Sequence, residues 1–416
     1  MPWSDSPSTG KVPVLKNISE LATCPPNRDR QDAGLVRNAA LVWRGDKILW
    51  VGEHRSLPAE YRSEPVTDCG GGLVIPGLID CHTHLCFGGW RGDEFERRLR
   101  GASYAEIASS GGGIRSTVTA TRAASIGELE RKAADVLVQM RKLGVTTVEC
   151  KSGYGLDLDT ELKQLEVYRR LGGRHDMALV PTFLGAHVVP HEFEQDRKAY
   201  IHLLCRELIP VVARRKLAVF CDVFVEQGAF SREEARQVLT AARDHGLGIK
   251  VHADQLSDGG GAALAAEMGA VSAEHLEYAS DEGIRALAAA AVVAVSLPLA
   301  SLYLRDRYLP ARRMLDAGVA VAVATDFNPG SAPSYHLPLA LTLACLNQGM
   351  SPSEALAGAT SVAARAVGLQ QSIGSLQPGY AADFALIDAP GLSHWLYHFR
   401  DNACVGVAKS GDLKFV

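Results

Sequence analysis

The sequence predicts an α/β protein: a (β/α)8 barrel of the TIM type with a small β-sandwich domain formed by both chain termini. Eight apolar, β-branched runs divide the middle of the chain, Ala/Leu/Arg/Glu-rich helical stretches separate them, and the two ends carry hairpin patterns instead. Continuous apolar runs between helices are typical of parallel strands buried on both faces, and an open doubly wound sheet is the alternative arrangement. The runs lie at 73–80, 145–150, 177–184, 218–226, 247–252, 270–276, 291–298 and 319–326.

Helical spacing is clearest in three of the stretches between these runs. Apolar residues recur there at intervals of three and four, as expected for helices that cover a sheet with one face. The stretches lie at 125–143, 231–245 and 281–291.

Both chain ends carry β-hairpin signals. Segments 39–43 and 48–51 flank a turn that contains Gly45, and segments 405–408 and 413–416 flank a turn that contains Gly411. Short apolar segments on either side of a glycine-containing turn indicate antiparallel strand pairs. Residues 1–35 are rich in proline, serine and charge and indicate a loosely structured entry. We expect two domains, a composite β domain of residues 1–75 plus 371–416 and a barrel of residues 76–370.

Composition excludes several functional classes. The 416 residues are 47% hydrophobic and 22% charged, which is ordinary for a soluble globular chain. A net charge of −4 without a long basic run argues against nucleic-acid and anionic-membrane partners, and no apolar stretch approaches the roughly 20 residues that span a bilayer. Nine scattered cysteines without a Cys-x-x-Cys pair are typical of reduced thiols. We expect a cytoplasmic, homodimeric protein that acts on a small molecule.

Metal-binding side chains close four of the eight runs. His82 and His84 follow the first run, His252 ends the fifth, His275 the sixth, and Asp326 the eighth. The His-x-His pair alone suits two hydrogen-bonded histidines equally well, but the joint pattern places four imidazoles and a carboxylate at one barrel mouth. Such donors suit Zn²⁺, Fe²⁺ or Mn²⁺, with a position left for water.

The segments around these residues resemble the amidohydrolase superfamily and, within it, the imidazolonepropionase family. The resemblance covers most of the barrel in the right order, whereas the first 35 residues carry no comparable signal. The segments that carry it are 74–84, Phe87-Gly88-Gly89-Trp90-Arg91, 149–156, 182–187, 252–256, 272–276 and 325–331.

This resemblance implies a hydrolase that opens the cyclic amide of 4-imidazolone-5-propanoate to give N-formimidoyl-L-glutamate in histidine degradation. It implies one divalent metal, Zn²⁺ or Fe²⁺/Fe³⁺, held by His82, His84, His252 and Asp326. Asp326 would also take a proton from the attacking water, and His275 would polarise the scissile carbonyl.

The substrate contacts are also carried over from the family. Arg91 would bind the carboxylate tail, because a guanidinium matches a carboxylate in two hydrogen bonds. Gln255 stands where some members have Glu; a neutral amide is no general base, so we expect it to hydrogen-bond the substrate ring during catalysis. The remaining candidates for substrate contact are Tyr154, His187, Asn328, Gly330 and Ser331.

Three alternatives stay open. Within the superfamily, a hydantoinase-like or dihydroorotase-like cyclic amidase or an aminohydrolase would use the same barrel. The fourth run ends in Glu226 and offers no lysine for a binuclear centre, which favours one metal, although Glu226 could bridge a second. A metal-binding barrel without catalysis is the second alternative. A structural zinc protein is the third, and it is disfavoured because structural sites are closed and rich in cysteine.

Overall fold

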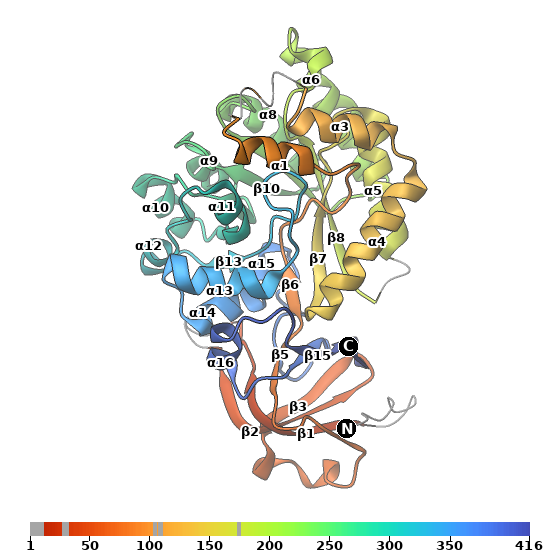
Figure 1. The fold of residues 1–416 in the computed structure, drawn as a ribbon, viewed down its shortest axis with the longest axis vertical. Helices are drawn as coiled ribbons and strands as arrows, with labels where there is room; N and C mark the ends of the chain where they lie inside the picture. Colours follow the sequence, from red (N-terminus) through yellow and green to blue (C-terminus); the bar gives the residue numbers. More distant parts are fainter. Residues whose placement is uncertain (1–11, 27–32, 103–105, 107–110, 173–175) are drawn as a thin grey trace.

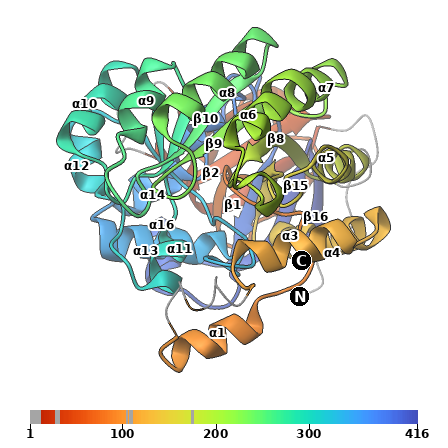
Figure 2. The ribbon, with the colours of Figure 1, turned by 90° about the horizontal axis from the view of Figure 1, so that it is seen from above.

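Two β-sheets organise the chain in the computed structural model, which describes residues 12–26, 33–102, 106, 111–172 and 176–416. One eight-stranded parallel sheet forms a barrel surrounded by helices, seen from above in Figure 2. The other eight-stranded sheet lies below the barrel and takes strands from both chain ends (Figure 1). The predicted fold class is confirmed, and the exact domain boundaries stay a prediction.

Each predicted apolar run includes all or most of one barrel strand. Neighbouring strands are parallel and follow the chain order from first to last, so the sheet lacks the reversal of order that defines an open doubly wound sheet. The strands are β6 (Leu78–Asp80), β7 (Val145–Lys151), β8 (Ala178–Ala186), β9 (Phe220–Val225), β10 (Gly248–Ala253), β11 (Ser272–His275), β12 (Val293–Ser296) and β13 (Val321–Val323).

The barrel closes through backbone bonds between the segments that follow β6 and β13. The Asp326 N–H donates to His82 O at 3.0 Å, and the His84 N–H donates to Phe327 O at 2.9 Å. Just below, the Asp80 carboxylate accepts bonds from the N–H and the hydroxyl of Thr325, at 3.1 and 2.6 Å. The first and last strands are therefore joined at the carboxyl end of the barrel.

The first apolar run does not form a single strand. Leu73–Pro76 (β5) belongs to the lower sheet, and β6 begins the barrel after Gly77. The Gly77 N–H donates to Asp383 O at 2.9 Å, and a Cβ at Gly77 would lie 2.9 Å from the Cβ of Thr146. Both strands are fully buried, and apolar residues flank Gly77 on each side, so hydrophobicity alone could not locate the break.

Helices cover the outside of the barrel, and the three predicted from their spacing are present. Ser125, Ser231 and Ser351 each begin a helix through a reciprocal pair of bonds with the glutamate three residues on, which satisfies two N–H groups of the first turn. The predicted helices are α4 (Ile126–Lys142), α8 (Arg232–Asp244) and α10 (Asp281–Ala289).

The other helices are mostly shorter, and no described helix is long and apolar enough to cross a membrane. Single turns occur at His54–Ser56, Ala59–Tyr61, His191–Phe193 and Leu204–Leu208. The remaining helices are α1 (Gly92–Leu99), α3 (Ile114–Ala123), α5 (Leu158–Gly172), α6 (Arg197–Leu203), α7 (Ile209–Arg214), α9 (Gly261–Glu267), α11 (Pro298–Leu304), α12 (Ala311–Asp316), α13 (Leu337–Gln348), α14 (Pro352–Gly358), α15 (Ser361–Ala366) and α16 (Leu392–Tyr397).

The lower sheet joins the two predicted hairpins around one apolar core. The Trp43 and Phe384 rings meet edge to face at 5.1 Å, and Leu15 and Leu413 complete the contact between the two chain ends. The sheet consists of β1 (Val14–Ala22), β2 (Leu35–Arg44), β3 (Lys47–Glu53), β4 (Val66–Asp68), β5, β14 (Phe384–Ile387), β15 (Cys404–Lys409) and β16 (Asp412–Phe415).

The expectation of a loosely structured entry over residues 1–35 is wrong for most of its described part. Strand β1 lies inside the lower sheet and pairs with β2, β4 and β5. Its register shifts between Leu15 and Ile18, where Asn17 has a φ of 56°. This bulge breaks the alternation of buried and exposed residues that signals a strand. Residues 1–11 and 27–32 lie outside the described residues.

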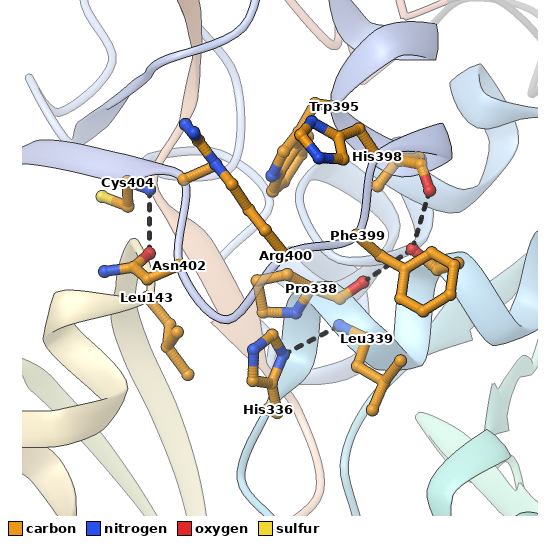
Figure 3. Close-up of a pocket in the computed structure, with 13 residues that line it drawn as sticks. Leu143, His336, Pro338, Leu339, Trp395, His398, Phe399, Arg400, Asn402 and Cys404 are labelled. Atoms are coloured by element: carbon orange, nitrogen blue, oxygen red, sulfur yellow. Dashed lines mark hydrogen bonds between the residues drawn. The ribbon is translucent and has the colours of Figure 1, made fainter.

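The C-terminal segment also packs against the barrel helices (Figure 3). The side chain of His336 caps α13 by accepting the Leu339 N–H at 3.0 Å. The Thr342 hydroxyl donates to Leu396 O at 3.1 Å, and the amide of Asn402 donates to Lys142 O at 3.0 Å. The segment is thereby bound to both α13 and the end of α4.

A pair of hairpin glycines tests how tightly the two chain ends meet. Gly411 has a φ of +80°, and a Cβ there would collide with Gly45 O and lie 2.9 Å from the Trp43 ring, whereas Gly45 has a φ of +55° and open space around it. We expect Gly45→Ala to lower the free energy of unfolding by about 1 kcal/mol. Gly411→Ala should lower it by roughly 2–4 kcal/mol because strain and overpacking add. Chemical denaturation measures both, and equal losses would contradict the close contact.

Candidate metal centre

Four imidazoles and one carboxylate meet at the carboxyl end of the barrel, and all five side chains are buried. Asp326 Oδ1 lies 3.3 Å from His82 Nε2 and 3.4 Å from His84 Nε2. His84 Nε2 lies 3.5 Å from His252 Nε2. The ring of His275 lies 5.4 Å from that of His252, centroid to centroid. The structure therefore brings together the residues that the ends of the apolar runs predicted.

The spacing of these atoms fits a metal ion. Donor atoms about 2.1 Å from a tetrahedral ion lie about 3.4 Å from one another, close to the three separations found here. In each of two overlapping groups, the donor atoms lie within 4.8 Å of one another. One group is His82, His84 and Asp326, and the other is His82, His252 and His275. Burial lowers the pKa of His84 to about 4, so its ring is neutral at pH 7, the form that binds a metal.

The backbone is strained where several of these strands end. Asp326 has a φ of 57°, His275 of 74°, Leu276 of 66° and Asp254 of 51°. All four lie in the left-handed region that residues other than glycine rarely adopt. Such conformations persist only where the surrounding structure enforces them, and they concentrate at functional sites. Here they turn the chain sharply at the barrel mouth, where the donor side chains are gathered.

A fully buried network of charges lies beneath the histidines, and sequence reasoning did not assign it. Lys151 Nζ lies 3.0 Å from Glu149 Oε1, 2.8 Å from Asp222 Oδ2 and 2.7 Å from Glu274 Oε2. Lys250 Nζ lies 3.1 Å from an oxygen of both Glu149 and Glu274. Burial alone would raise the pKa of the Glu274 carboxyl, but the two ammonium groups hold it well below its ordinary value.

Two carboxylates of this network face the outer nitrogens of the histidines. Glu274 Oε2 lies 2.6 Å from His82 Nδ1, and Asp222 Oδ2 lies 2.8 Å from His252 Nδ1. A carboxylate next to Nδ1 favours the tautomer with the proton on that atom, which leaves Nε2 free as a metal ligand. The signal in the sequence was the placement of charged residues at alternate positions of apolar strands, such as Glu149 and Lys151.

Arg91 is held at the mouth by neighbours that the sequence did not reveal. Its Nε donates to Thr117 Oγ1 of α3 at 2.8 Å. Its guanidinium packs on Gly330, where a Cβ would lie 3.0 Å from Arg91 Cζ. Lys132 of α4 donates to Gly89 O at 2.6 Å and lies over the Trp90 ring at 4.4 Å, which fixes the preceding loop. The side chain is thus oriented from α3, α4 and the loop after β13.

Tyr154 and His187 lie beside His84. The Tyr154 ring centroid is 5.8 Å from that of His84. The His187 ring stacks on the His84 ring, with 5.3 Å between the two centroids. The turn that carries Tyr154 is fixed from α5: the buried Glu161 carboxylate accepts bonds from three backbone N–H groups, and Gln164 accepts the Tyr154 N–H at 3.2 Å. A carboxylate and an amide inside a helix carry no local signal of such a role.

Asn328 and Ser331 are engaged within the loop after Asp326. Asn328 Oδ1 accepts the N–H groups of Gly330 and Ser331 at 2.7 and 2.8 Å, and its amide donates to Asp326 O at 2.6 Å. The Ser331 hydroxyl donates to Asp326 Oδ2 at 3.3 Å. These side chains hold the loop and the outer oxygen of Asp326 in place.

Gln255 follows Asp254 at the end of β10 and is half-buried. The loop that carries it is tied down by Glu226, whose carboxylate accepts the N–H of Leu256 at 2.8 Å and also binds the hydroxyl of Ser257. Glu226 belongs to none of the potential metal-binding groups among the described residues. Its carboxylate holds this loop in place.

Comparison with known proteins identifies the chain. A family model described as the amidohydrolase family matches residues 73–416. A protein of Symbiobacterium thermophilum named imidazolonepropionase is 49% identical over 409 residues, covering 96% of each chain. The chain belongs to the imidazolonepropionase family of amidohydrolases. It is therefore a hydrolase, and the family resemblance seen in its sequence is confirmed. Another imidazolonepropionase, from Anaeromyxobacter dehalogenans, is 48% identical over 406 residues, covering 96% of this chain and 94% of that one.

Solved structures with low sequence identity share the fold of this imidazolonepropionase family member. An adenosine deaminase of Xanthomonas campestris with bound zinc superposes with a TM-score of 0.72 at 18% identity, covering 99% of this chain and 94% of that one. A guanine deaminase of C. acetobutylicum with bound guanine gives a TM-score of 0.70 at 17% identity, covering 97% and 100%. These likenesses extend across the barrel and the lower sheet together.

Addition of Zn²⁺ to the metal-free protein should raise its thermal midpoint. An ion that binds only the folded state stabilises it by about 2.7 kcal/mol at a hundredfold excess over Kd. We expect His252→Ala to lose most of this shift, because one of the converging donors is gone. His202→Ala, a change at an exposed histidine of α6, is the matched control. A shift in His252→Ala equal to that of the unmodified protein, measured by calorimetry, would contradict the assignment.

Proposed function

We propose that this chain hydrolyses the cyclic amide of 4-imidazolone-5-propanoate to N-formimidoyl-L-glutamate in histidine degradation, with a metal held by His82, His84, His252 and Asp326. One observation carries the proposal: a chain nearly half identical, over almost its full length, to proteins named imidazolonepropionase gathers four buried imidazoles and a carboxylate at its barrel mouth. In the reaction, the water oxygen adds to the ring carbonyl carbon. The bond from that carbon to the ring nitrogen breaks, and the nitrogen takes a proton.

Asp326 and His275 supply the proton transfers and the polarisation in this proposal. A divalent ion in this donor set supplies Lewis acidity that makes a water nucleophilic near neutral pH. Asp326 takes a proton from the attacking water, with its Oδ2 oriented by the Ser331 hydroxyl. His275 donates to the scissile carbonyl oxygen. Glu277 Oε2 lies 3.6 Å from His275 Nδ1.

Arg91 binds the propanoate tail in this proposal. Its Nε is occupied by Thr117, which leaves the terminal guanidinium nitrogens to face a carboxylate. Tyr154 and His187 contact the imidazolone ring, because both rings adjoin that of His84. Gly330 and Ser331 complete the far wall with Asn328. Gln255 hydrogen-bonds the ring as a neutral amide, and proton transfer falls to Asp326 and His275.

One metal ion is proposed, and it is zinc or iron, since imidazole and carboxylate ligands accept both. The bonds of Glu226 to the loop after β10 support a single ion, as does the absence of a lysine from the end of β9. We also infer a cytoplasmic homodimer, in line with an enzyme of this size whose described cysteines form no disulfide. Sedimentation measures the assembly directly.

An absorbance assay tests the reaction. Freshly generated 4-imidazolone-5-propanoate should lose its ring chromophore in the presence of the metal-loaded protein. A chelator should prevent this, and His252→Ala should lower kcat/KM roughly 100-fold or more, because the nucleophile loses its activation. A folded, metal-loaded protein that leaves the compound intact would overturn the proposal, and a panel of hydantoins, dihydropyrimidines and aminopurines would then separate a related cyclic amidase from an aminohydrolase.

Gly330→Ala should weaken substrate binding more than it slows the chemistry. The added methyl group displaces the Arg91 guanidinium, so the bond to the propanoate is lost and KM rises about tenfold with kcat little changed. Gly92→Ala is the matched control, because it adds a methyl group beside Arg91 in open space. Steady-state kinetics separate the two, and an unchanged KM in Gly330→Ala would argue against the role of Arg91.

Gln255→Glu should not accelerate the reaction, because the proposed proton transfers do not need a carboxylate at this position. We expect kcat to stay within about threefold of that of the unmodified enzyme, or to fall, since a charged group replaces an amide donor. A gain of about tenfold or more in kcat would show that a base is missing here and would contradict the assignment of proton transfer.

A further inference from the structure

A single buried lysine connects the two carboxylates that face the candidate ligand histidines. Lys151 is the last residue of β7 and is fully buried, and in the described structure its ammonium pairs with carboxylates and not with an imidazole. Its ammonium lies 2.7 Å from Glu274 Oε2 and 2.8 Å from Asp222 Oδ2. These are the same two oxygen atoms that face His82 Nδ1 and His252 Nδ1.

The contacts form a continuous path between two of the proposed metal ligands. From the His82 ring the path runs through Glu274 to the Lys151 ammonium, and from there through Asp222 to the His252 ring. Glu274 Oε2 also lies 3.7 Å from His252 Nδ1, a longer contact than the 2.8 Å from Asp222 Oδ2. The two rings themselves lie 4.6 Å apart, centroid to centroid, and converge on the other side toward Asp326 and His84. Lys151 therefore lies opposite the proposed metal position, across both rings.

We propose that Lys151 is a positioning residue that sets the metal affinity of a centre it does not touch. It does so by holding the Glu274 and Asp222 carboxylates against the outer nitrogens of His82 and His252. This inference rests on the proposed metal centre. Partners of this kind fix the tautomer and orientation of a ligand histidine, and their loss typically weakens metal binding 10- to 100-fold.

The electrostatics of the pocket explain why a cation is needed at this point. Glu149, Asp222 and Glu274 bring three carboxylates together in a fully buried interior, where like charges repel strongly. Without the ammonium of Lys151, the ring-facing oxygens of Asp222 and Glu274 have no common cation between them. Repulsion then moves them apart, and the two imidazoles lose the partners that orient them.

Lys250 provides a matched control inside the same network. It is also fully buried and also pairs with Glu149 and Glu274, each at 3.1 Å. Its bond to Glu274 is to Oε1, which also accepts from the Ser272 hydroxyl, and not to the oxygen that faces His82. Lys250 and Asp222 are neighbours across β10 and β9, but no ion pair joins the Lys250 ammonium to the Asp222 carboxylate in the described structure. Loss of Lys250 thus removes the same charge without breaking the path between the two histidines.

The test compares Zn²⁺ affinity in Lys151→Met and Lys250→Met. Each change removes one ammonium and keeps a side chain of similar length. Competition with a chromogenic chelator should show Zn²⁺ binding weakened about 10- to 100-fold in Lys151→Met and less than about threefold in Lys250→Met. Circular dichroism of the metal-free proteins establishes that both are folded. Unchanged affinity in Lys151→Met, or equal losses in the two variants, would overturn the proposal.

A second variant keeps the proposal testable if Lys151→Met does not fold. The double change Lys151→Met/Asp222→Asn removes one charge of each sign and so relieves the unpaired carboxylate. We expect Zn²⁺ affinity to stay at least about tenfold below that of the unmodified protein, because the path to His252 is still broken. Full recovery of affinity would show that Lys151 only balances charge, and would overturn the positioning role.

The outcome is separable from that of the proposed reaction, because Zn²⁺ binding is measured without substrate. A protein that fails to open the imidazolone ring but loses zinc affinity with Lys151 would overturn the function and retain the inference. If the unmodified protein opens the ring and Lys151→Met keeps full zinc affinity, the proposed function stands and the role of Lys151 is overturned.

Discussion

The closing seam of the barrel is the constraint on which the rest of the structure depends. Two backbone hydrogen bonds join the segments after β6 and β13, and the residues that make them include His82, His84 and Asp326. The same backbone atoms that close the sheet therefore fix the origins of three candidate metal ligands relative to one another. Closure of the fold and assembly of the site are one event, and the left-handed φ of Asp326 is tolerated because the seam enforces it.

Charge compensation inside the barrel is the second requirement of this site. Buried carboxylates can orient histidines only if cations offset the cost of burying them, and Lys151 and Lys250 supply those cations. The barrel interior is thus layered, with apolar side chains of the strands around a central charged network and the imidazoles above it. A hydrophobic replacement of the whole network would be compatible with the fold but would leave the histidine rings without fixed orientations.

The sequence predicted the barrel well because its signals are local. Each parallel strand is an apolar run, and the rule that active sites lie at carboxyl ends of strands was enough to bring His252 and Asp326 together. What failed were features decided by distant partners. Strand β1 was missed because a bulge at Asn17 breaks its alternation of buried and exposed residues.

The supporting residues of the site were hidden for a similar reason. Thr117, Glu161 and Glu226 each act on a loop from another element, and nothing in their own neighbourhood distinguishes them from ordinary helix or strand residues. Their roles become visible only when the loops are placed in space. Lys151 is the exception, because a lysine two residues after a glutamate in an apolar strand does indicate a buried pair.

The lower sheet imposes an order on biosynthesis. Strand β5 pairs on one side with β1 and on the other with β14, and nearly the entire barrel lies between β5 and β14 in the sequence. While the ribosome is still making the barrel helices, β5 has one unpaired edge, and such an edge can recruit other extended segments. Completion of the sheet must wait for the last strands to emerge. This chain therefore has a long interval in which chaperone protection of one exposed strand would matter more than the rate at which the barrel itself folds.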